Sequence, residues 1–92
     1  MELLDKKFLR NKNVAWRVID GEALLVHPST SIISPLDEVC TRIWELVNGE
    51  RTGRDIASVI EIEFAENLSV IETDLSVFLD ELLQNNLITL CD

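Results

Sequence analysis

Residues 14–27 read VAWRVIDGEALLVH, and this stretch decides the fold. Two runs of β-branched, aromatic and aliphatic residues flank the pair Asp20-Gly21. A type I′ turn needs positive φ at both central positions, and Asp-Gly is one of the pairs that supply it. The stretch therefore predicts an antiparallel hairpin. Pro28-Ser-Thr-Ser31 then predicts a turn, and Ile32-Ile33 predicts a short third strand.

Three amphipathic helices follow the hairpin. Apolar residues recur at helical spacing within residues 36–47, 56–64 and 71–83. Each helix is expected to open with a capping sequence: Ser34-Pro35-Leu36-Asp37, Thr52-Gly53-Arg54-Asp55 and Ser69-Val70-Ile71-Glu72. Gly49 is expected to follow the first helix as its C′ residue, and Asn85-Asn86 to break the third before a short extended tail at 87–90.

These elements predict one α+β domain over residues 14–92. It resembles a winged helix-turn-helix, with a three-stranded antiparallel sheet followed by three helices. Residues 1–13 are polar and basic, and we interpret them as a flexible N-terminal arm with at most a short strand near Phe8. The chain shows neither the apolar core of a signal peptide nor a run long enough to span a membrane, so we expect a cytoplasmic protein.

Charge is distributed very unevenly along the chain. The first 54 residues carry eight acidic and eight basic side chains, whereas residues 55–92 carry nine carboxylates and no Lys or Arg. The whole formal charge of −9 therefore belongs to the second and third helices and the tail. In DNA-binding winged-helix domains the last helix faces phosphates, which this acidic helix would repel. The pattern argues against nucleic acid as the partner.

The residues offer no catalytic set, metal site or cofactor site. The chain has a single histidine, His27, and its two cysteines lie too far apart in sequence for a metal or redox motif. We interpret Cys40 as a small buried thiol and both tryptophans, Trp16 and Trp44, as core residues. Ser34 is explained by helix capping. We therefore expect a protein that binds by shape and is not an enzyme.

The third strand offers a place for such binding. Ser31-Ile32-Ile33 would be a short, uncharged edge with unpaired backbone groups, to which an extended peptide can add as a further strand. The third helix would form the other wall of the groove. Since successive side chains of a strand point to opposite faces, at least one of Ile32 and Ile33 is expected to fill the core.

The chain also resembles the PqqD-like proteins, the peptide-recognition elements of ribosomally made, post-translationally modified peptides. The resemblance covers about residues 14–90. It rests on a set of short motifs: Ile43-Trp44-Glu45-Leu46, Asn48-Gly49, Arg51-Thr52, Ile56, Asp74-Leu75, Phe78-Leu79 and Asn86-Leu87-Ile88. The family often has Gly where this chain has Asn86, a mild departure because Asn also tolerates the left-handed conformation.

The resemblance implies capture of the leader segment of a precursor peptide by strand addition. The leader is then presented to a modifying enzyme, commonly a radical S-adenosylmethionine enzyme, as in the biosynthesis of pyrroloquinoline quinone or related peptide products. It implies no cofactor. The edge residues carried over by strand position are Ser31, Ile32, Ile33 and Ser34. The residues expected from the apolar stripe of the third helix are Leu75, Phe78, Leu79 and Leu82.

Two alternatives remain open at this point. One is a winged-helix DNA-binding regulator, favoured by the order of elements and the basic arm and opposed by the charge. The other is a fixed, non-catalytic subunit of a maturation enzyme, in which the groove holds a partner protein. We expect a monomer or weak dimer, because an unpaired edge can also pair with its own copy.

Overall fold

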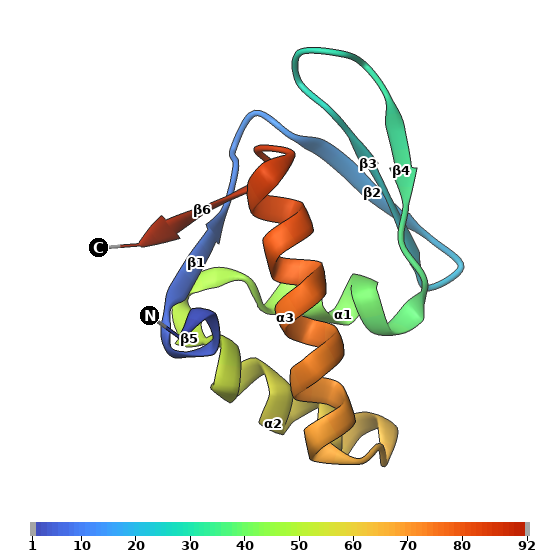
Figure 1. The fold of residues 1–92 in the computed structure, drawn as a ribbon. Helices are drawn as coiled ribbons and strands as arrows, with labels where there is room; N and C mark the ends of the chain where they lie inside the picture. Colours follow the sequence, from blue (N-terminus) through green and yellow to red (C-terminus); the bar gives the residue numbers. More distant parts are fainter. Residues whose placement is uncertain (1, 92) are drawn as a thin grey trace.

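A computed structural model describes residues 2–91, which form two small sheets and three helices (Figure 1). In chain order the elements are a 3₁₀ turn at Leu3–Asp5, β1 (Lys7–Arg10), β2 (Ala15–Ile19), β3 (Glu22–Val26), β4 (Ile33–Pro35), α1 (Glu38–Leu46), β5 (Asn48–Thr52), α2 (Gly53–Phe64), α3 (Leu68–Gln84) and β6 (Ile88–Cys91).

The first of the two sheets contains the hairpin expected from the sequence. Its strand order is β2-β3-β4, with both pairs antiparallel. Asp20 and Gly21 have φ of 52° and 83°, as a type I′ turn requires. Three helices follow this sheet along the chain, so the expected α+β class and order of elements are confirmed.

The second sheet was not expected, and it corrects the interpretation of residues 1–13 as a flexible arm. Its order is β5-β1-β6, so the N-terminal strand is central and the C-terminal strand lies beside it. Phe8 on β1 is 0% exposed and pairs with Leu90 of β6, while Leu4 is also buried. The alternation of β1 turns Phe8 inward and leaves Lys7 and Leu9 exposed, which explains why a polar, basic segment can still belong to the core.

Two helix starts differ from the expected caps. The cap of α1 is Asp37, whose Oδ1 accepts from the Cys40 N–H at 2.8 Å, and the cap of α3 is Asn67, which accepts from Ser69 and Val70. In both cases the residue immediately before the first helical residue, an Asp or an Asn, is the cap in place of the expected Ser, because its side chain reaches the free N–H groups of the first turn. The capping box of Thr52 and Asp55 at α2 is confirmed.

The end of α1 also differs from the expectation. The helix stops at Leu46, before Gly49, and Gly49 lies inside β5 with φ of 86°. A Cβ at this position would come within 3.3 Å of Leu9 Cδ1 on the neighbouring strand. The glycine therefore permits the close approach of β5 to β1 and supplies the positive φ where the register between these strands shifts.

The tryptophans meet where the two sheets and α1 converge. Trp44 is 0% exposed, as expected, whereas Trp16 is 38% exposed and the core interpretation is wrong for it. Their rings form an edge-to-face pair with centroids 6.0 Å apart. Arg10 lies 5.3 Å from the Trp16 ring and donates to the carbonyl oxygens of Trp44 and Glu45, so it covers the pair and closes the end of α1.

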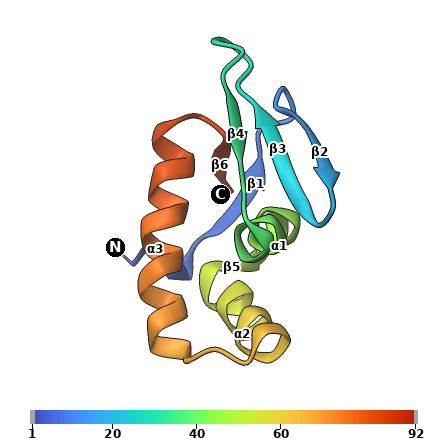
Figure 2. The same ribbon diagram turned by 90° about the vertical axis from the view of Figure 1, so that its right-hand side faces the viewer.

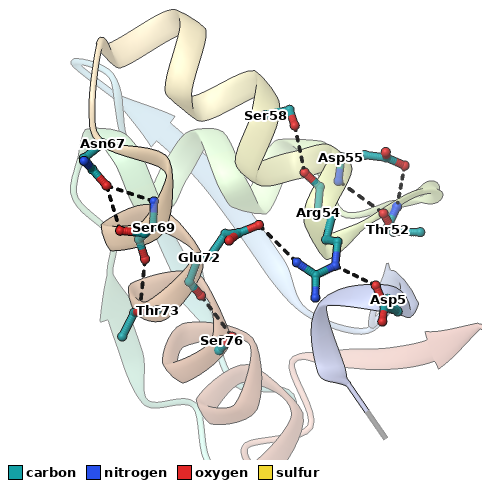
Figure 3. A network of polar contacts seen from close by, with 10 residues as sticks. All are labelled: Asp5, Thr52, Arg54, Asp55, Ser58, Asn67, Ser69, Glu72, Thr73 and Ser76. Carbon is teal, nitrogen blue, oxygen red and sulfur yellow. Dashed lines mark hydrogen bonds and ion pairs between the residues drawn. The ribbon is translucent and has the colours of Figure 1, made fainter.

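An ion-pair network ties the N-terminal turn to two helices. Arg54, near the start of α2, donates from Nε to Asp5 at 2.7 Å and from Nη1 to Glu72 of α3 at 3.2 Å (Figure 3). Both pairs are partly exposed, so each contributes little to stability alone. Together they link α2 to α3 and to the turn at Leu3–Asp5 on this side of the molecule.

Candidate functional site

The edge of β4 is open. Within the described residues β4 pairs only with β3, and Figure 2 shows it as the side of its sheet that faces α3. The His27 N–H donates to the Ile32 carbonyl at 3.0 Å, and the Leu36 N–H to the Ala23 carbonyl at 2.8 Å. Hydrogen-bonded pairs alternate along an antiparallel ladder, so Ser34 must be the residue of β4 whose backbone groups face β3.

It follows that the open edge presents the backbone groups of Ile33 and Pro35. Ile33 offers both an N–H and a C=O, whereas Pro35 has no N–H and offers only its C=O. An incoming strand therefore meets one donor and two acceptors. The edge is short and carries a proline, features that limit indiscriminate strand pairing.

A groove of about 670 Å³ separates β4 from α3. Its β4 side is lined by Ile32, Ser34 and Pro35, and its α3 side by Phe78, Glu81 and Leu82. Buried apolar residues, among them Leu25, Leu36 and Leu87, also line it. The arrangement places an unpaired strand edge beside an apolar trough.

A second hollow of about 320 Å³ extends the groove along α3. The two share Asp37, Cys40 and Phe78, and the extension continues to Val70 and Glu66 at the start of the helix. We call the two together the β4–α3 groove. Its lining runs along α3 from Asn85 to Val70, which suits an extended segment.

The four expected edge residues lie in three different places. Ile32 and Ser34 line the groove, whereas Ile33 faces a hollow on the opposite side of the sheet with Trp16 and Val26. Ser31 is exposed in the preceding turn, with φ of 60°, and lines neither. Both isoleucines are 59% exposed, so the expectation that one fills the core is wrong. Leu25 and Leu36 occupy the core at this end of the sheet instead.

Ser34 corrects a further expectation. It belongs to β4 and does not cap α1; its hydroxyl lies 2.9 Å from His27 Nε2. The pair joins β4 to the residue that follows β3, beside the groove.

Three of the four expected helix residues line the groove. Phe78 and Leu82 line its larger part and Leu75 lines the extension, with Phe78 common to both. Leu79 is 0% exposed and lines neither part, so its position gives no support to the expectation of direct peptide contact. A helix of 3.6 residues per turn carries Leu75, Leu79 and Leu82 toward the core and rotates Phe78 toward the groove.

Several other residues that line the groove were not predicted from the sequence. The face of α3 that borders the groove includes Val70, Asp74, Phe78 and Glu81, spaced by four, four and three residues. That spacing was readable in the sequence, but the charged members made it look like a solvated face. Asp37, Cys40 and His27 had no such signal, because only the packing of α1 and β3 against α3 brings them to the groove.

The Cys40 thiol lies half-buried on the floor between the two hollows. Burial, followed by the hydrogen bond with Asp37 and the negative charges of Asp37, Glu81 and Asp74, raises its pKa to about 12. The group is therefore a neutral thiol at physiological pH and a poor nucleophile.

Comparison with known proteins gives a consistent picture. The family model of coenzyme PQQ synthesis protein D (PqqD) matches residues 22–88. A solved structure, TbiB1 in complex with the TbiA(beta) leader peptide, is similar over 87% of this chain and 93% of its own, with 30% identity and a TM-score of 0.78. No curated protein matches the sequence. None of the helices among residues 2–91 combines the length and apolar character needed to cross a bilayer.

Proposed function

This chain belongs to the family of coenzyme PQQ synthesis protein D, and from that premise we propose that it captures the leader segment of a ribosomally made precursor peptide. The leader adds to the open edge of β4 as a further strand and lies in the β4–α3 groove. The protein acts without catalysis, as an adaptor that presents the peptide to a modifying enzyme. In this family setting the proposed recipient is a radical S-adenosylmethionine enzyme, and the proposed compartment is the cytoplasm.

The observation that carries the proposal is the open edge beside the groove. Ile33 directs both of its backbone groups away from β3, next to a trough lined by Phe78 and Leu82. Main-chain hydrogen bonds to the edge would supply affinity, and the trough would receive alternate side chains of the added strand. The solved complex of TbiB1 with a leader peptide supports leader binding by a protein of this fold.

The test is an amide-resolved NMR titration with the leader half of a short peptide encoded beside this gene. We expect shifts confined to residues 31–36 and the groove face of α3. Ile33→Pro should abolish binding, because it removes the one N–H donor of the open edge and places a ring there, yet it leaves the Leu25–Ser34 pair of the β3–β4 ladder intact.

Ile33→Val is the matched control, since it shortens the same exposed side chain without changing the backbone. It should bind as the unmodified protein does. A folded Ile33→Pro variant that binds the leader with unchanged affinity would refute strand addition, and so would shifts produced by duplex DNA and not by the peptide.

A further inference from the structure

The β4–α3 groove is apolar along its floor and acidic along its rim. The ionisable residues that line it are His27, Cys40, Asp37, Glu66, Asp74 and Glu81, and no Lys or Arg lines either part. We propose that the groove selects leader segments in which Lys or Arg flanks an apolar anchor residue. The inference rests on the proposed function and adds the chemistry of the peptide that the site accepts.

Among residues 2–91 no ion pair neutralises the rim carboxylates. Every ion pair among residues 2–91 involves Arg42 or Arg54, and their partners are Asp5, Glu45, Glu63 and Glu72. None of the four groove carboxylates is among these partners. Asp37 accepts the cap hydrogen bond of α1, but a backbone N–H does not cancel its charge.

These charges act on the same point of the groove. Asp37, Asp74 and Glu81 come from the start of α1 and from two turns of α3, yet all three negative charges contribute to holding the Cys40 thiol protonated. Cys40 lies on the floor shared by both parts of the groove. A cation on a bound peptide would lie in that potential, partly shielded from water by the groove walls.

The spacing of the carboxylates suggests a pattern for the peptide. Asp74 and Glu81 are seven residues apart on α3, roughly 10 Å along the helix axis. Phe78 lies between them on the same face. In a strand, residues i, i+2 and i+4 share a face and span about 13 Å. Basic residues at i and i+4 with an apolar residue at i+2 would therefore place two cations near the carboxylates and the anchor on Phe78.

The experiment is a selection of random 15-residue peptides displayed on phage against the intact protein. Each round is counter-selected against the Ile33→Pro variant, so that only peptides using the open edge of β4 are kept. We expect the retained peptides to be enriched in Lys and Arg, depleted in Asp and Glu, and to carry an apolar residue two positions from a basic one.

A charge-neutralised pair of variants then tests the rim directly. Asp74→Asn with Glu81→Gln should weaken a selected peptide by roughly 2- to 30-fold, the contribution of two partly exposed ion pairs. The matched control is Asp80→Asn with Glu22→Gln, which removes the same net charge from exposed positions outside the groove and should leave affinity unchanged. The same peptide with Gln in place of Lys should bind the two double variants with equal affinity.

The outcomes separate the two proposals. Edge-dependent peptides that are neutral or acidic on average would overturn the charge inference and leave strand addition intact. So would equal losses in the groove and control double variants, which would indicate only a long-range effect of net charge. If no selected peptide binds the unmodified protein more tightly than it binds Ile33→Pro, strand addition is overturned. The inference about the groove's charge then fails with it.

Discussion

Gly53, the first residue of α2, lies against the N-terminal turn. A Cβ at this position would come within 2.9 Å of Leu4 Cα and 3.1 Å of the Leu4 carbonyl oxygen, both backbone atoms that cannot rotate away. The close contact is the physical reason for a glycine where helix propensity favours alanine. A residue that looks like part of a capping sequence is thus also the point at which the N-terminal segment packs.

We expect Gly53→Ala to destabilise the protein. Propensity alone would stabilise the helix by at most about 1 kcal/mol, whereas overpacking of this kind costs about 1–3 kcal/mol, so the clash should prevail. Urea unfolding followed by circular dichroism measures the difference. Ser58→Ala on the exposed side of α2 is the control and should be near neutral. A Gly53→Ala variant as stable as the unmodified protein would show that the turn at Leu3–Asp5 does not pack as described.

At the scale of the element, β1 is the strand that joins the two ends of the chain. It is central in its sheet, between β5 and β6, and its buried residue Phe8 is one of the largest fully enclosed side chains among residues 2–91. A flexible arm and a central strand make opposite predictions for substitutions in this segment.

Phe8→Ala should reduce the free energy of unfolding by about 3–5 kcal/mol, the usual effect of removing a buried aromatic side chain. For a domain of this size such a loss approaches the whole of its stability. Leu9→Ala is the matched control, because Leu9 is the next residue of the same strand and is 47% exposed; it should change stability much less. Equal, small effects of both substitutions in chemical denaturation would restore the picture of a loose arm.

The first residues of α1 and α3 show how far the bounds of an element can be predicted from sequence. The existence and order of the hairpin, the short strand and the three helices follow from local pattern, since turn residues and apolar periodicity act over a few residues. The first residues of α1 and α3 could not be predicted in this way, because each helix has two competing caps. These are Ser34 and Asp37 for α1, and Asn67 and Ser69 for α3. Which one wins depends on where the preceding segment is held: Ser34 is paired with Leu25 in the sheet and is not available to cap.

At the scale of the whole molecule, charge is the property that the fold concentrates. The net charge of −9 arises entirely beyond Arg54, and packing brings four carboxylates to one groove that no Lys or Arg lines. Unpaired like charges held together in a compact state repel one another and lower its stability at low ionic strength.

Salt should therefore stabilise this protein. Raising NaCl from about 10 mM to about 200 mM shortens the Debye length from roughly 30 Å to below 10 Å, which screens the repulsion across the groove. We expect the midpoint of thermal unfolding to rise, and to rise less for Asp74→Asn with Glu81→Gln than for Asp80→Asn with Glu22→Gln. A fall in the midpoint with salt would mean that the ion pairs of Arg42 and Arg54 outweigh the repulsion.

By itself the sequence determined the α+β class, the hairpin turn at Asp20-Gly21, the capping box at Thr52 and the acidic character of the second half. Each of these depends on neighbouring residues or on composition, so no distant contact is needed to infer it. The resemblance to PqqD-like proteins, carried by several short motifs, agrees with the family that the comparisons show. The same local reasoning also identified Phe78 and Leu82 as residues that line the groove.

Only the tertiary structure decided the sheet β5-β1-β6 and the composition of the groove. Strand pairing between residues some 40 to 80 positions apart leaves no local signature, so Phe8 could not be recognised as core. The direction of the open backbone groups of Ile33 depends on the register with β3, and the burial of Leu79 depends on how α3 rotates against the core. Asp37 joins Asp74 and Glu81 beside Cys40 for the same reason, because α1 and α3 must come together before these charges can meet.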